Sequence, residues 1–225
     1  MERPSATVAS ARPRCHTGAT KALDVEEDCL LQEHRIFPTL VYSASLAELA
    51  AHRRALVGDV LALVAATDVE PEVSRTRELL TDRPEPHWRA YFAGLDGIVD
   101  RVASDLHPRW THRTAHSWGL VFRSTDDWPS NFRSLHAHAQ ATFSTVCYLD
   151  VPPELVDAGA GGTLLRNPLA NVHHRYYDVD YIRFDPVELG VVVFPGFLEH
   201  LPERPDGRVE FSRPRVVVAT DFCFY

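Results

Sequence analysis

Hydrophobic positions in the first half of the chain recur at helical spacing in two segments. In residues 45–67 the apolar side chains fall three or four residues apart, which predicts an amphipathic helix. Ser45 and Glu48 have the spacing of a capping box at its start. Residues 85–106 predict a second helix, whose apolar stripe is typical of a packing surface rather than of a cofactor site. The stripe consists of Trp88, Tyr91, Phe92, Leu95, Val99, Val102 and Leu106.

From residue 117 on, the pattern changes to short apolar runs separated by Pro, Gly and Asp. Such runs, bounded by turn residues, predict β-strands. The predicted strands are residues 117–123, 133–140, 142–151, 162–166, 181–184, 190–194 and 215–224. Many short strands with these breaks favour a mostly β fold with flanking helices, namely a jelly roll, or double-stranded β-helix, with the helices packed on one face of a sheet.

The length of the chain, 225 residues, fits one well-packed domain, which we place at residues 34–225. Residues 1–33 mix small and charged residues without periodicity, so we interpret them as a flexible arm or a lid. The formal net charge of −8 argues against nucleic acid as a partner, because phosphate binding needs a basic surface. A homodimer is a further hypothesis for the assembly.

Hydropathy and cysteine usage bear on the compartment. The sequence has no apolar run of the length that a membrane span needs, and its N-terminus lacks the apolar core of a signal peptide. The four cysteines show no CxxC spacing and are expected to be free thiols in a reducing environment. We therefore expect a cytoplasmic protein without a membrane partner.

Three histidines in the second half of the chain have the spacing of a metal site. His136 and His138 lie two apart on a predicted strand, so their side chains point to the same face. His200 follows the apolar run 191–194, which a Pro-Gly pair ends. Imidazole suits Fe(II), and three ligands on one side leave open positions, although the usual facial triad has a carboxylate where this chain has His138. The alternative is ordinary polar surface, since the chain has 12 His.

Arg215 begins the strongly β-prone terminal segment 215–224. A guanidinium in a partly apolar barrel grips a carboxylate through two hydrogen bonds, so Arg215 is a candidate for holding a carboxylate co-substrate. The alternatives are a surface arginine paired with Glu210 or Asp221, or the same role for Arg213, which precedes a proline and is therefore the weaker candidate.

Together these pieces resemble the 2-oxoglutarate- and iron(II)-dependent oxygenases that carry an HxH motif followed by a strand of the S-G-V-Y-Y-L type. The resemblance runs from about residue 36 to the C-terminus. The matching pieces are HAH at 136–138, FSTVCYLDVP at 143–152, GGTLLRNP at 161–168 and FPGFLEH at 194–200. The chain departs from the family at three positions where Pro, Gly and Ser are frequent, namely Ala139, Thr145 and Val217.

The resemblance implies a double-stranded β-helix that uses Fe(II), 2-oxoglutarate and O2. It implies that the three histidines hold the iron and that Arg215 holds the distal carboxylate of 2-oxoglutarate. Arg213 and Tyr148 are further candidates for cofactor contacts. The expected reaction is oxidation of a C–H bond in a small-molecule or peptide substrate, with release of succinate.

Two segments that flank the predicted strands supply candidate substrate residues. Trp128 and Asn131 precede the HxH strand, and His173 and Tyr177 belong to a polar, aromatic stretch between later strands. The alternatives are a loop anchor for Trp128 and a solvent-exposed loop for the second segment.

Two other classes of protein fit parts of the pattern. A three-His cupin dioxygenase would bind its substrate directly to iron without 2-oxoglutarate, and the G-x4-P-G-x3-H sequence at 190–200 resembles the second cupin motif. A non-catalytic β-barrel binding module would carry the histidines as polar surface.

Overall fold

The computed structural model describes residues 32–36, 39–66, 75–76, 79–107, 109–110, 113–128, 135–168 and 180–225. Two antiparallel sheets form its centre. The large sheet has the strand order β1-β2-β7-β4-β9-β3, and the small sheet has the order β6-β5-β8. The large sheet comprises β1 (Gln32–Ile36), β2 (Thr39–Ser45), β7 (Gly190–Pro195), β4 (Phe143–Asp150), β9 (Glu210–Phe224) and β3 (Arg113–Ser124). The small sheet comprises β6 (Tyr181–Phe184), β5 (Thr163–Arg166) and β8 (His200–Pro202).

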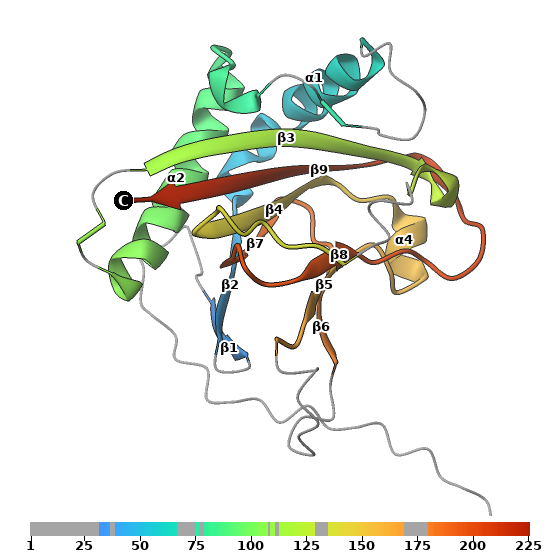
Figure 1. Cartoon of the computed structure of the whole chain (residues 1–225). Coiled ribbons are helices and arrows are strands. Elements are labelled where there is room, and N and C mark those ends of the chain that lie inside the picture. Colours follow the sequence, from blue (N-terminus) through green and yellow to red (C-terminus); the bar gives the residue numbers. More distant parts are fainter. Residues whose placement is uncertain are drawn as a thin grey trace, which may run out of the picture.

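The two long helices cover one face of the large sheet, and the small sheet lies against the other face together with the short helix at residues 153–157 (Figure 1). The helical segments are η1 (Ala47–Ala51), α1 (Arg53–Ala65), η2 (Leu80–Asp82), α2 (Pro86–Leu106), η3 (Thr125–Asp127) and α4 (Pro153–Asp157). None of the described helices is long and apolar enough to cross a membrane. The mostly β jelly roll with flanking helices agrees with the fold predicted from the sequence.

Both faces of the large sheet are buried, which explains why its central strands are continuous apolar runs. On β7, Val191 and Val193 pack toward the helices, whereas Val192 and Phe194 pack toward the small sheet. Alternate residues of a strand point to opposite faces, so one strand supplies both cores.

The first helix begins later than the sequence predicts. Ser45 ends β2, where it pairs with Gly190, and its backbone therefore belongs to the sheet. The N-cap of η1 is Leu46, which makes no side-chain cap hydrogen bond, so the predicted capping box is wrong. The second helix starts with Pro86 at its first turn, where the missing N–H of proline is not needed.

Three further boundaries differ from the prediction. Residues 135–142 contain no strand: His136 forms only an isolated bridge with His200, because this segment crosses β8 at a single point. β9 begins at Glu210 rather than at residue 215, and β1 begins inside the predicted arm, at Gln32. Residues 1–31 lie outside the described residues, so the arm or lid stays a prediction.

Candidate metal centre

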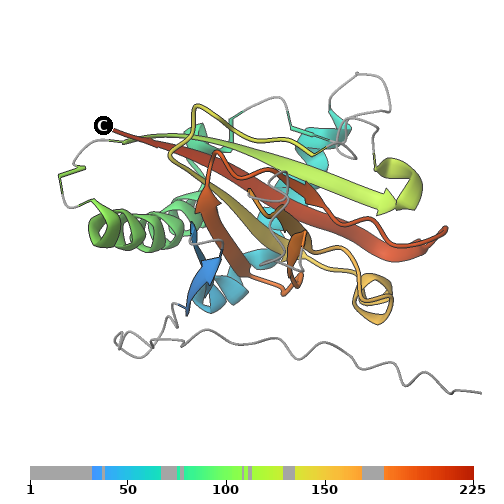
Figure 2. The ribbon, with the colours of Figure 1, turned by 60° about the horizontal axis from the view of Figure 1, so that its bottom comes forward.

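The floor of the site is one face of the antiparallel pair β3 and β9, which run side by side across the molecule (Figure 2). Residues two apart on each strand share this face. The facing pairs along it are Phe122 and Arg215, Leu120 and Val217, Trp118 and Ala219, His116 and Asp221, and Thr114 and Cys223. The first three pairs line a narrow cavity, and the last two line a surface groove that continues from it.

His136, His138 and His200 meet where the cavity and the groove join. Each histidine has one ring nitrogen that lies within 4.8 Å of a ring nitrogen of each of the other two. His136 and His200 are held by two backbone hydrogen bonds to each other, of 3.2 and 2.8 Å, and the His138 N–H donates to the Gly196 carbonyl at 2.8 Å. Backbone pairing, rather than a continuous strand, therefore brings the HxH motif to His200.

His200 is oriented by the backbone. Its Nδ1 donates to the Leu198 carbonyl at 3.0 Å, which leaves the Nε2 lone pair free to bind a metal. Burial, followed by the neighbouring His136, lowers the pKa of His200 to about 3, so its ring is neutral at physiological pH. A neutral, buried imidazole is ready to act as a ligand without losing a proton.

His138 is oriented by a carboxylate. Its Nδ1 lies 2.6 and 2.7 Å from the two carboxylate oxygens of Asp221, and the Ser144 hydroxyl donates to Asp221 at 2.7 Å. The Trp118 ring stacks on the imidazole, with ring centroids 5.6 Å apart. Asp221 was considered from the sequence only as a partner of Arg215, and this pairing is wrong.

Arg215 lies at the far end of the cavity and is 1% exposed. Its Nε donates to the Gly161 carbonyl at 3.1 Å, and its guanidinium lies over the rings of Phe122, Tyr148 and Trp128 at 5.0, 5.6 and 5.7 Å. Within the described part of the chain, Nη1 is buried without a hydrogen-bond partner and the guanidinium forms no ion pair. The surface alternative for Arg215 is therefore wrong.

Burial lowers the pKa of Arg215 to about 10, which still leaves it protonated at neutral pH. A buried charge without a partner costs several kcal/mol. An anion that entered the cavity would remove this cost, and a carboxylate matches the geometry of a guanidinium.

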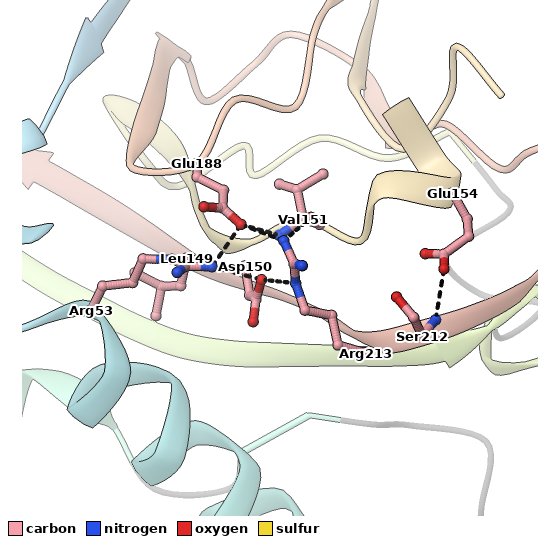
Figure 3. A network of polar contacts seen from close by, with 8 residues as sticks. All are labelled: Arg53, Leu149, Asp150, Val151, Glu154, Glu188, Ser212 and Arg213. Carbon is pink, nitrogen blue, oxygen red and sulfur yellow. Dashed lines mark hydrogen bonds and ion pairs between the residues drawn. The ribbon is translucent and has the colours of Figure 1, made fainter. Parts of the chain in front are cut away.

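Arg213 lies on the outside of the sheet in a network of ion pairs (Figure 3). Its Nε donates to Asp150 at 2.6 Å, and its Nη2 donates to Glu188 at 2.8 Å and to the Val151 carbonyl at 2.7 Å. Arg53, from α1, donates to the same two carboxylates. The donors of Arg213 are thus directed away from the cavity, and its predicted role as a cofactor contact is corrected to a structural one.

Two other residues predicted from the sequence, Tyr148 and Trp128, pack against the Arg215 guanidinium. Tyr148 is buried, its hydroxyl is hydrogen-bonded to Thr163 Oγ1 at 2.6 Å, and its ring lies under the guanidinium. Trp128 is 1% exposed, packs on Phe122 with ring centroids 4.3 Å apart and lies beside the Arg215 guanidinium, so it does not line the described cavity or the substrate groove. Asn131, His173 and Tyr177 lie outside the described residues.

No family model and no curated protein sequence matches the chain. Among solved structures, HygX from Streptomyces hygroscopicus, with nickel and 2-oxoglutarate bound, aligns at 12% identity and a TM-score of 0.51, covering 82% of this chain and 82% of HygX. The chain has the fold of the 2-oxoglutarate and iron(II) oxygenases.

Two more structures are similar to the chain. The 2-oxoglutarate-dependent carbocyclase SnoK from nogalamycin biosynthesis aligns at 15% identity and a TM-score of 0.49, covering 79% of this chain and 75% of SnoK. A prolyl-4-hydroxylase from Pseudomonas putida aligns at 15% identity and a TM-score of 0.48, covering 81% of this chain and 86% of the hydroxylase.

The residues present in the site fit both a metal ion and a carboxylate co-substrate. Three histidine nitrogens can converge at one point, and the guanidinium of Arg215, which forms no ion pair within the described part of the chain, is buried at the other end of the same cavity. Sequence reasoning missed Asp221, Ser144 and Thr163. The sequence did indicate that Asp221 shares a face with Arg215, because it stands six residues later on the same predicted strand and side chains an even number of residues apart point to the same face.

Proposed function

We propose that the protein is a non-haem Fe(II)- and 2-oxoglutarate-dependent oxygenase, which oxidises a C–H bond of a small-molecule or peptide substrate with release of succinate and CO2. One observation carries the proposal: the buried guanidinium of Arg215, which has no ion-pair partner among the described residues, shares a cavity with three converging histidines. The fold, which HygX shares with 2-oxoglutarate bound, supports it.

In this proposal the three histidines hold the iron, His200 and His138 through Nε2, because their Nδ1 atoms are engaged by Leu198 and Asp221. Arg215 takes the distal carboxylate of 2-oxoglutarate. The bound iron and 2-oxoglutarate supply the oxidising chemistry. The apolar walls of the cavity, which include Leu120, Val146 and Val217, exclude water between the two charged ends.

The surface groove on the other side of the histidines is where the substrate would lie. It is lined by side chains of mixed character, namely Arg75, Leu79, Thr114, His116, Gln140, Cys223 and Tyr225. It shares His136, His138 and Trp118 with the cavity, so a substrate in it reaches the metal ligands directly.

The test is an anaerobic titration of the protein with Fe(II) and then 2-oxoglutarate, followed by the weak visible absorption of the iron–keto acid chelate. We expect this absorption in the wild type and in Arg213→Ala, and its loss in Arg215→Ala with iron still bound. Bound iron without the absorption in the wild type would contradict the use of 2-oxoglutarate. A wild type that binds no iron would instead favour the non-catalytic binding module.

A three-His dioxygenase that binds its substrate directly to iron is the second candidate. The observation that favours it is the set of candidate ligands, since the group of described side chains that could hold a metal contains three imidazoles and no carboxylate. That reaction assigns no function to the buried Arg215, which lacks an ion-pair partner among the described residues, so the three-His dioxygenase is the weaker proposal. Succinate formation from 2-oxoglutarate separates the two candidates.

A further inference from the structure

His138 occupies the position at which a facial triad usually has a carboxylate. Replacing that residue by an imidazole removes one negative charge from the ligand set. The structure places a carboxylate one hydrogen bond further out, because Asp221 contacts His138 Nδ1 through both of its oxygens, at 2.6 and 2.7 Å. His200 differs, since its Nδ1 donates to an uncharged backbone carbonyl.

Asp221 is held in this position from its own side. It is paired with Ser144 in the register of β4 and β9, and the Ser144 hydroxyl donates to Asp221 Oδ1 at 2.7 Å. Ser144 is buried, so its hydroxyl has little competition from water. Asp221 therefore cannot turn away from His138 without breaking two hydrogen bonds.

The ring of His138 is also fixed from its face. Trp118 stacks on it with an interplanar angle of 29°, and Arg75 lies on the Trp118 ring at 4.4 Å from its centroid. The hydrogen bond fixes the direction of Nδ1, and the stacking fixes the plane of the ring. Both constraints act on the one ligand that departs from the usual facial triad.

We infer that Asp221 is a positioning residue of the metal centre. Its carboxylate accepts the Nδ1 proton of His138, which leaves the Nε2 lone pair directed at the metal. Its negative charge also compensates, one hydrogen bond away from the metal, for the carboxylate ligand that His138 replaces. A carboxylate behind a metal-bound histidine raises the basicity of the ligand and fixes its tautomer. This inference rests on the proposed function, because it requires that His138 binds the metal.

The test is the affinity of the protein for Co(II), measured anaerobically in the absence of 2-oxoglutarate. We expect Asp221→Asn to weaken Co(II) binding by about 10- to 100-fold, the range measured when such partners are removed from other metal sites. The visible bands of bound Co(II) should shift, because a weaker donor changes the ligand field. Ser144→Ala should act in the same direction and less strongly.

Glu210→Gln is the matched control, since Glu210 is an exposed carboxylate on the same strand and lies far along β9 from Asp221. It should leave both the affinity and the bands unchanged. The melting temperature of each metal-free variant shows whether it folds, and a purely structural role for Asp221 would lower this temperature without shifting the Co(II) bands.

Three results would overturn the inference. Co(II) affinity of Asp221→Asn within twofold of the wild type would remove Asp221 from the centre. Complete loss of binding, as expected for His200→Ala, would make Asp221 a direct ligand. A wild type that binds no Co(II) would overturn the proposed function itself, and with it this inference, whereas the first two results leave the proposed function standing.

Discussion

Arg215 and the three histidines are buried or partly buried polar groups whose placement costs stability in the free protein. Burial keeps His200 neutral and leaves Arg215 charged without an ion-pair partner among the described residues. Buried ionisable groups with strongly shifted pKa values cluster at functional sites, where a bound ligand can pair with them. Removing the charge of Arg215 should therefore weaken ligand binding without destabilising the free protein.

Arg215→Met should change the affinity for 2-oxoglutarate without lowering the stability of the metal-free protein. Methionine fills a similar volume without a charge, so the melting temperature of the metal-free protein should stay the same or rise by up to about 5 °C. The affinity for 2-oxoglutarate should fall by about 100-fold or more, because a charge-assisted contact is lost. Calorimetric titration with 2-oxoglutarate in the presence of Mn(II) measures this affinity.

Arg213→Met is the control for Arg215→Met and should give the reverse result. Arg213 is 45% exposed, so loss of its ion pairs should cost only about 1 kcal/mol of stability. Its removal should leave 2-oxoglutarate binding unchanged. Equal effects of the two substitutions on 2-oxoglutarate binding would contradict the assignment of Arg215.

His200→Ala should abolish metal binding, because it removes one of three ligands and leaves a cavity at the junction of the two sheets. His116→Ala is the matched control, since His116 is exposed, lines the neighbouring groove and is not part of the cluster. The measurement is the metal content of each variant after anaerobic loading, which should be near zero for His200→Ala and equal to that of the wild type for His116→Ala. A His200→Ala variant that retains one equivalent of iron would remove His200 from the site.

At the scale of elements, the site depends on turns that bring separate segments together. Gly196 follows β7, its carbonyl accepts the His138 N–H, and its own N–H donates to the Thr142 carbonyl at 3.2 Å. The segment that carries the HxH motif is therefore attached to the sheet through backbone contacts rather than through a ladder of its own. Side-chain patterns cannot reveal such an attachment.

Gly196→Ala tests this attachment. A Cβ at this position would lie 2.3 Å from the Ala141 carbonyl oxygen and 2.6 Å from that of His138, so the backbone would have to move. We expect loss of about 1–3 kcal/mol of stability and weaker Co(II) binding. Urea unfolding and Co(II) titration measure the two quantities.

Gly58→Ala is the control for Gly196→Ala. Gly58 lies inside α1, where an added Cβ meets nothing within 4 Å, so alanine should be neutral or stabilising by up to about 1 kcal/mol. A Gly196→Ala variant that binds Co(II) like the wild type would show that the turn does not position His138.

Short apolar runs bounded by turn residues predicted β3, β4, β7 and β9, because the central parts of these strands are buried on both faces. This pattern did not predict that residues 133–140 lack a regular strand in their described part, since two histidines two apart satisfy a strand pattern as well as a loop. The choice of Arg215 over Arg213 was accessible from the sequence, because only Arg215 starts the apolar run. The pairing of Asp221 with His138 was not, because 83 residues separate them and only the fold brings them together.

In the molecule as a whole, the candidate metal site lies at the junction of the two sheets. His200 begins β8 of the small sheet, whereas Arg215, Asp221 and Trp118 belong to the large sheet. A metal bound at the histidines therefore links the small sheet to the segment that packs on the large one. Ligands that bind only the folded state stabilise it according to their concentration and affinity.

Metal binding should consequently raise the melting temperature. At a metal concentration of about 100 times the dissociation constant, the expected stabilisation is about 2.7 kcal/mol, which corresponds to about 5–10 °C for a protein of this size. Differential scanning fluorimetry with Mn(II) measures the shift. The His200→Ala variant should show none, and an equal shift in that variant would place the metal elsewhere.

The proposed function is tested most sharply by a crystal structure of the protein grown anaerobically with Mn(II) and 2-oxoglutarate. We expect a metal ion bound by His136, His138 and His200, with one carboxylate of 2-oxoglutarate on Arg215. A metal bound away from these histidines, or an Arg215 guanidinium without the carboxylate when the metal and 2-oxoglutarate are bound, would contradict it.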